Sequence, residues 1–258
     1  MAGDIATTKA LLADLVGFDT TSHKSNIAII DYIEAYLARH GVTSARVPTA
    51  DGLKASLFAT IGPVDVPGIA LSGHTDVVPV TGQAWDTDPF NLVERDGRLY
   101  GRGACDMKAF LACMLAMVPQ LKARALKVPI HLAFSYDEEV GCTGVRPMVA
   151  ELGKSLPLPR MVFVGEPTSM SVVDAHKGPM RWQVEVTGRA VHSSMPHLGV
   201  NAITYAGRLI AELARIEDDL KAGARSARFD PPYTSLQVTE LSGGTAPNIV
   251  PIICTFGW

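Results

Sequence analysis

Cysteine is scarce in this sequence, and its few cysteines are not arranged in pairs. The 258 residues contain 4 of them, with no CxxC spacing and no framework spacing. This pattern argues against a disulfide-stapled secreted domain and favours a reducing, cytoplasmic location. The chain also begins without a basic region, apolar stretch and cleavage site, so its first residues predict an amphipathic helix and no signal peptide.

An excess of positive charge is missing as well. The chain has 23 Lys and Arg against 26 Asp and Glu, a net charge of -3. The sequence therefore predicts no basic patch that would bind nucleic acid and no polybasic segment that would bind a membrane surface. No apolar run is expected to be long enough to span a bilayer. The hydrophobic share of 47% nevertheless predicts a packed globular core.

Apolar residues in the first two thirds of the chain alternate between helical and strand-like spacing. Residues 26–40 carry a helical stripe that ends at Gly41, and short apolar runs bounded by turn residues follow. The segment around Asp96-Gly97 predicts a hairpin. Strands alternating with helices predict an α/β fold with a mixed, largely parallel sheet sandwiched by helices.

The pattern changes after Lys177. A half-exposed strand in RWQVEVTGR, a helix near 201–221 and two further strands predict a smaller α+β domain. We therefore expect one domain over residues 1–177 and another over 178–258. The chain ends at Phe256-Gly257-Trp258 within an apolar strand and without polar residues, which is typical of a C-terminal truncation.

Three predicted strands each end in side chains suited to binding a metal. The segments GIALSGHTD, HLAFSYDEE and MVFVGEP end in, respectively, His74 with Asp76, Glu138 with Glu139, and Glu166. In open α/β sheets a site lies outside the carboxyl ends of the strands, so these side chains are expected to converge.

Asp106 is expected to reach the same place from a glycine-rich turn, GRGACDMK, that opens a long helix. Carboxylates packed so densely repel one another unless divalent cations lie among them. A set of one histidine and several carboxylates suits zinc, and cobalt or manganese would also be accepted. A single HxD or Glu-Glu pair is usually just solvated, so the prediction rests on all four segments coinciding.

The motifs SGHTDVVP, GRGACDMKAF, SYDEEVGCTG, VGEPT, TGRAVHSSMPHLGVNA and SGGTAPNIVP occur in this order. Together they resemble the zinc-dependent family that contains acetylornithine deacetylase, succinyl-diaminopimelate desuccinylase, carboxypeptidase G and aminoacylase. The resemblance covers nearly the whole chain and implies a zinc-exopeptidase-like catalytic domain, 1–177, with a lid or dimerisation domain, 178–258.

Carried over residue by residue, the resemblance implies two zinc ions per complete subunit. His74 and Glu166 would bind one ion, Glu139 the second, and Asp106 both. Glu138 would be the general base, and Asp76 would orient His74. A cis peptide bond is implied between Asp106 and Met107.

In the second domain, His192 matches a histidine that stabilises the oxyanion in the partner subunit's active site, which implies a homodimer. The alternative is a residue hydrogen-bonded to the neighbouring Ser193 or Ser194. Asn248 matches an asparagine that lines the substrate site. Cys142 is expected either near the metal ions or packed in the interior.

The segments GCTG and AHKGPMRW most resemble acetylornithine deacetylase. The implied activity is metal-dependent removal of the N-acetyl group from N2-acetyl-L-ornithine, a small N-acyl amino acid, in arginine biosynthesis. Succinyl-diaminopimelate desuccinylase and a general N-acyl-amino-acid hydrolase remain alternatives, as does a non-catalytic relative acting as a binding subunit. An oxidoreductase is disfavoured because no GxGxxG follows the early strands.

The sequence departs from the family at one point. The family's second zinc has a further histidine ligand well downstream of the small domain, and the chain ends before it. These 258 residues are therefore expected to be inactive alone.

Overall fold

The computed structural model describes residues 4–258, which form two compact units that divide between Ser171 and Val172. The first unit contains the five-stranded sheet, and its helices are α1 (Ile5–Val16), α2 (Ile27–Arg39), α3 (Ala109–Lys122) and α4 (Val145–Glu151). The predicted helix over residues 26–40 is confirmed as α2. The functional assignments of the two units remain predictions.

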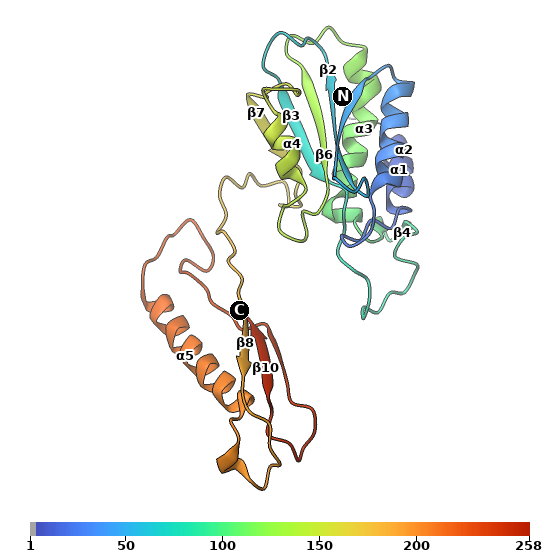
Figure 1. The fold of residues 1–258 in the computed structure, drawn as a ribbon. Helices are drawn as coiled ribbons and strands as arrows, with labels where there is room; N and C mark the ends of the chain where they lie inside the picture. Colours follow the sequence, from blue (N-terminus) through green and yellow to red (C-terminus); the bar gives the residue numbers. More distant parts are fainter. Residues whose placement is uncertain (1–3) are drawn as a thin grey trace. The chain divides into compact units, whose positions relative to one another are not determined.

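The five-stranded sheet is mixed, as predicted (Figure 1). Its strands, in spatial order, are β1 (Ser44–Pro48), β2 (Ala55–Ile61), β6 (Ile130–Ser135), β3 (Ile69–His74) and β7 (Met161–Val164). The β1–β2 and β2–β6 pairs are antiparallel, whereas β3 pairs in parallel with both β6 and β7. The carboxyl ends of β6, β3 and β7 therefore lie at one edge of the sheet.

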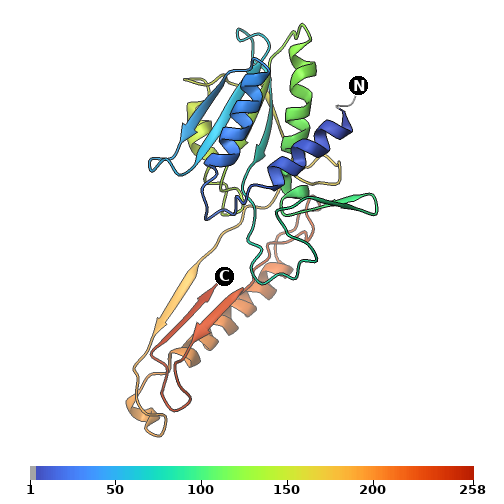
Figure 2. The ribbon, with the colours of Figure 1, turned by 90° about the vertical axis from the view of Figure 1, so that its right-hand side faces the viewer.

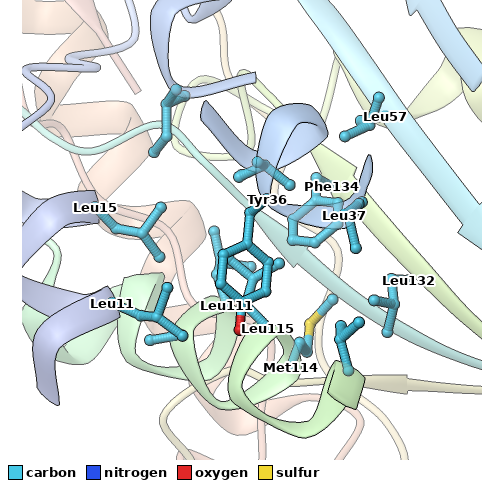
Figure 3. Packing of buried hydrophobic residues seen from close by; sticks show 14 of the residues in the cluster. Leu11, Leu15, Tyr36, Leu37, Leu57, Leu111, Met114, Leu115, Leu132 and Phe134 are labelled. Carbon is cyan, nitrogen blue, oxygen red and sulfur yellow. The ribbon is translucent and has the colours of Figure 1, made fainter. Parts of the chain in front are cut away.

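Successive side chains of the central strands pack against different helices on the two faces of the sheet. Leu57 on β2 and Phe134 on β6 belong to the core cluster formed with α1, α2 and α3 (Figure 3), whereas Phe58 packs with α4 on the other face. Successive side chains of a strand point to opposite faces, so one sheet supports two helical layers. Burying each such side chain contributes roughly 1.5–3 kcal/mol.

One segment corrects the expectation that no apolar run is long enough to span a membrane. Ala104–Lys122, 19 residues with a mean hydropathy of 1.3, has sufficient length and composition. Half of this segment is buried inside the protein, and α3 packs against α1, α2 and the sheet. Its apolar character is thus explained by its place in the core of the first unit.

The predicted hairpin is present as β4 (Val93–Arg95) and β5 (Arg98–Tyr100). Both turn residues have positive φ, 53° for Asp96 and 71° for Gly97. A two-residue turn needs such a backbone to match the twist of antiparallel strands, which is why Asp-Gly pairs occur there.

The second unit is built as its sequence pattern predicts, with β8 (Gln183–Thr187), η2 (Pro196–Leu198), α5 (Ala202–Ala222), β9 (Glu240–Gly243) and β10 (Ile253–Gly257). The sheet is antiparallel with the order β8-β10-β9, and α5 packs on it (Figure 2). Asn201 caps α5 by accepting a hydrogen bond from the Thr204 amide at 3.0 Å. Cys254 and Phe256 are buried beneath the helix.

His131, the second residue of β6, is buried at 1% exposure and predicts that the stability of the protein depends on pH. Its Nδ1 lies 2.9 Å from Thr60 Oγ1, and its Nε2 has no hydrogen-bond partner among residues 4–258. Burial holds the pKa of His131 below its ordinary value of 6.5. The unfolded chain therefore binds a proton more readily than the folded one.

We expect the free energy of unfolding to fall as the pH drops below about 6.5, until the lower folded pKa is reached. His131→Gln removes this contribution and leaves the other titrating groups in place. Urea unfolding of both proteins between pH 7.5 and 5 measures the difference. The two stability curves should converge toward low pH, and curves that stay parallel contradict the prediction.

Candidate metal centre

The predicted ligands lie where the parallel strands end. β3 ends at His74, whose register partner is Ser135, the last residue of β6. After Ser135 the chain turns into the segment that carries Glu138 and Glu139. β7 runs parallel to β3 and ends shortly before Glu166. Parallel pairing thus brings three segments, far apart in sequence, to one edge of the sheet.

Asp106 reaches this edge from η1 (Ala104–Lys108), the short segment before α3. Gly103 opens it with a φ of 76°, and a Cβ there would lie 2.7 Å from Val77 Cγ1, so this turn requires glycine. Asp106 itself has a non-helical backbone, and the peptide bond between Asp106 and Met107 is cis, as the resemblance implies.

One imidazole nitrogen, His74 Nε2, lies close to carboxylate oxygens of three acidic residues. His74 Nε2 lies 3.1 Å from Asp106 Oδ1, 3.7 Å from Glu166 Oε1 and 3.9 Å from Glu138 Oε2. Two groups of side chains have ligand atoms within 4.8 Å of one another: His74, Asp106, Glu139 and His74, Glu138, Glu166. The structure therefore brings together all five predicted side chains, but their separation does not distinguish the roles of Glu138 and Glu139.

Asp76 holds His74 and the neighbouring turn at the same time. His74 Nδ1 lies 2.9 Å from the Asp76 carbonyl oxygen and 3.3 Å from its Oδ1, so Nδ1 carries the hydrogen and Nε2 faces the acids. The Asp76 carboxylate also accepts hydrogen bonds from the Glu138 and Glu139 amides at 3.1 and 3.3 Å. Asp76 thus sets the histidine tautomer, with its carbonyl and carboxylate oxygens, and the position of the Glu138-Glu139 turn, with its carboxylate.

The electrostatics of the centre show how strongly the acids interact with His74. Burial lowers the pKa of His74, but the hydrogen bond and charge of Asp76 and the charge of Glu166 outweigh it and raise the pKa to about 9. Burial and the charge of Asp106 raise the pKa of Glu139. Burial likewise raises the pKa of Glu166, with nearby carboxylates adding to the effect.

A divalent cation fits this donor set. His74 offers Nε2 as a ligand atom at 1% side-chain exposure, and the carboxylates around it remain 35–47% exposed, open enough for an ion and a small molecule. A cation of charge two neutralises the crowded acids more completely than a single proton on His74. One imidazole and several carboxylates form a zinc-type donor set that cobalt and manganese also accept.

Cys142 lies next to the centre and is exposed, so the first of its two expected placements is observed. Its Sγ lies 3.3 Å from Glu138 Oε1. The residues 137–143 form a tight turn in which the Gly141 and Cys142 amides both donate to the Glu138 carbonyl at 3.0 Å.

His192 and Asn248 lie together in the second unit. His192 bridges to Ile249, and the Ser193 amide donates to the Asn248 carbonyl oxygen at 2.9 Å. His192 Nδ1 accepts from the Ser194 amide at 3.2 Å and lies 2.7 Å from Ser194 Oγ. The predicted contact with a neighbouring serine is therefore present, and it leaves an exposed Nε2–H as a donor.

A pocket of about 920 Å³ in the second unit contains none of the predicted site residues. Trp182 and Trp258 stack within it, 4.4 Å apart, alongside apolar side chains of α5. Its lining includes no histidine, cysteine or aspartate, and Glu240 is its single acidic side chain, so it lacks the imidazole and the cluster of acids that distinguish the metal centre.

The sequence analysis missed two buried side chains that support the centre. Ser22 Oγ donates to Asp76 Oδ2 at 2.8 Å from the loop after α1. Lys108, the last residue of η1, is fully buried, and its Nζ donates to the Phe18 carbonyl at 2.7 Å. The polar run Thr20-Thr21-Ser22 before a helix was the available signal for the first. For Lys108, the only signal in the sequence was its position two residues after Asp106 in the motif GRGACDMKAF.

Comparison with known proteins decides the family. The model of peptidase family M20/M25/M40 matches residues 70–248, which include the strand ends described above. The chain belongs to this peptidase family. Its members are hydrolases, which agrees with the donor set at the sheet edge.

Curated relatives resemble the chain over nearly its whole length. Acetylornithine deacetylase of Myxococcus xanthus is 39% identical over 267 residues, covering 99% of this chain and 67% of the relative. The acetylornithine deacetylase of Pasteurella multocida is 34% identical, covering 95% of this chain and 64% of the relative. The chain thus spans about two thirds of the length of these enzymes.

Solved structures agree with the fold. An M20 family metallo-carboxypeptidase from Sulfolobus solfataricus has a TM-score of 0.72 at 17% identity, covering 97% of this chain and 70% of that one. A tripeptidase from Staphylococcus aureus has a TM-score of 0.69 at 20% identity, covering 100% and 66%. At such identities the likeness concerns the fold of the M20 peptidases alone.

Proposed function

We propose that the protein containing these residues is a zinc-dependent amide hydrolase that removes the acetyl group from N2-acetyl-L-ornithine, a step of arginine biosynthesis. The observation that carries the proposal is the cluster of one imidazole and four carboxylates at the carboxyl ends of β3, β6 and β7. The substrate is proposed from the acetylornithine deacetylases that share 34–39% of the sequence.

The proposed roles follow the predicted residues. His74, Asp106, Glu139 and Glu166 would hold two metal ions, and Asp76 would keep His74 in the binding tautomer. When bound, such ions polarise a carbonyl oxygen and make water more acidic. Glu138 would take a proton from the attacking water and deliver it to the leaving nitrogen.

Two groups of the second unit would act in the partner subunit's site. The exposed Nε2–H of His192 suits an oxyanion donor, because its Nδ1 is already occupied by Ser194. Asn248 would bind substrate. A homodimer formed through the second unit, a cytoplasmic location and inactivity of the 258 residues alone belong to the same proposal.

Steady-state assays of the protein that contains these residues test the substrate. With zinc bound, we expect kcat/KM for N2-acetyl-L-ornithine to exceed that for N-succinyl-diaminopimelate by at least about tenfold, since the two acyl groups differ in size and charge. A chelator should abolish both activities. Preference for the succinyl substrate would indicate a desuccinylase, and the absence of any hydrolysis by the zinc-loaded protein would indicate a non-catalytic binding relative.

A further inference from the structure

The backbone immediately before the proposed general base is held in an unusual conformation. Asp137 has a φ of 54°, in the left-handed region that residues with a Cβ rarely adopt. Its carbonyl accepts a hydrogen bond from the Thr143 amide at 3.1 Å, which closes the turn over residues 137–143. Because Asp137 and Glu138 are neighbours in this turn, its backbone conformation sets the direction of both side chains.

The Asp137 side chain is paired with a lysine from a segment distant in the sequence. Lys54, directly before β2, places its Nζ 2.5 Å from Asp137 Oδ1, and both side chains are less than one fifth exposed, at 17% and 18%. Nζ also donates to the Ser22 carbonyl. An ion pair so sheltered from water is stronger than one on the open surface.

These contacts close a ring around the Glu138-Glu139 turn. Lys54 holds Asp137 and the Ser22 carbonyl, and Ser22 Oγ donates to Asp76. Asp76 in turn accepts the amides of Glu138 and Glu139. The Lys54 ammonium thus holds the first residue of the turn, Asp137, and the Asp76 carboxylate holds the backbone of the two residues that follow.

We propose that Lys54 and Asp137 are positioning residues. Their ion pair fixes the turn 137–143 so that Glu138 and Glu139 face His74. The catalytic consequence of this arrangement rests on the proposed function. The structural consequence does not, because it concerns the turn itself and is measurable without metal or substrate.

Amide hydrogen exchange of the metal-free 258-residue chain tests the proposal. In Lys54→Met and in Asp137→Asn, which is isosteric, we expect the Glu138, Glu139 and Thr143 amides to exchange about 10- to 100-fold faster, the equivalent of one charged hydrogen bond. Lys54→Arg retains the charge and should restore most of the protection. The double variant should exchange no faster than either single variant, since both remove the same pair.

Lys9→Met is the matched control. It removes an ion pair of the same 2.5 Å length, Lys9–Glu94, whose side chains are 40% and 53% exposed and lie away from the turn. Exchange over residues 137–143 should be unchanged in this variant. If Lys54→Met does not fold, Asp137→Asn carries the test alone.

Cobalt binding provides a second readout. We expect Lys54→Met and Asp137→Asn to weaken Co²⁺ binding by about 10- to 100-fold and to alter its visible absorption, because Glu139 no longer holds its position. Unchanged exchange at the turn overturns the proposal. So does faster exchange spread evenly over the first unit, which would show a general loss of stability. A failure of acetylornithine hydrolysis in the parent protein affects neither measurement.

Discussion

Glu138→Gln in the protein that contains these residues should lower turnover strongly and leave metal binding intact. The amide has nearly the same shape as the carboxylate but cannot accept the proton of the attacking water, so kcat should fall about 10²- to 10⁴-fold. The affinity for zinc should stay within a few-fold of the parent, because the proposed ligands His74, Asp106, Glu139 and Glu166 remain. Steady-state kinetics and zinc content measured on the same preparation check both parts.

Glu139→Gln is the companion variant that separates the two neighbouring glutamates. Both lie in candidate ligand groups with His74, so geometry by itself does not assign their roles. We expect Glu139→Gln to lose metal and, with it, activity. Glu94→Gln, on the exposed hairpin, changes the same chemical group and should affect neither. Loss of zinc from Glu138→Gln, or near-normal turnover, would contradict the proposed division of roles.

Asp106→Asn should remove most of the metal affinity of the 258-residue chain. Asp106 Oδ1 is the carboxylate oxygen closest to His74 Nε2, at 3.1 Å, and the resemblance makes it the ligand shared by both ions. An asparagine keeps the size but not the charge, so we expect zinc affinity to fall by at least about 100-fold, the upper end of the effect of losing a residue that only supports a ligand. Equilibrium dialysis with metal analysis measures it.

Thermal unfolding provides an independent check on Asp106. A ligand present at 100 times its dissociation constant stabilises the folded state by about 2.7 kcal/mol. The parent chain should therefore unfold at a higher temperature with zinc than with chelator, and Asp106→Asn should not. Asp86→Asn, an 88% exposed aspartate, is the control and should respond to zinc like the parent. A full zinc response in Asp106→Asn would remove Asp106 from the proposed ligands.

Local patterns were sufficient for much of the architecture. The Asp96-Gly97 pair predicted a hairpin because its turn requires two residues with positive φ, and both have it. The stripe over residues 26–40 predicted α2 because helical side chains recur every 3.6 residues. The expectation that no apolar run is long enough to span a membrane was wrong for Ala104–Lys122, which has the required length and composition. Only the structure shows that half of this segment is buried inside the protein.

The candidate ligands were predictable for a different reason. All of them except Asp106 end or follow an apolar strand, and parallel strands bring their carboxyl ends to one edge wherever they stand in the sheet. The supporting residues were not predictable in this way. No sequence motif links Lys54, Ser22 and Asp137. Their contacts depend on how the start of β2, the loop after α1 and the turn after β6 meet in space.

By itself, the sequence determined the α/β class, the succession of helices and strands, and the acids and histidine available for a metal. Periodicity and chain order contain that information. Only the tertiary structure decided that β2 lies antiparallel to β6, that His74 Nε2 faces three carboxylates, and that Asp76 and Lys54 together hold the start of the Glu138 turn. Those contacts join residues that are distant in the chain. They are strong because both partners are partly shielded from water, and this shielding arises only when the chain folds.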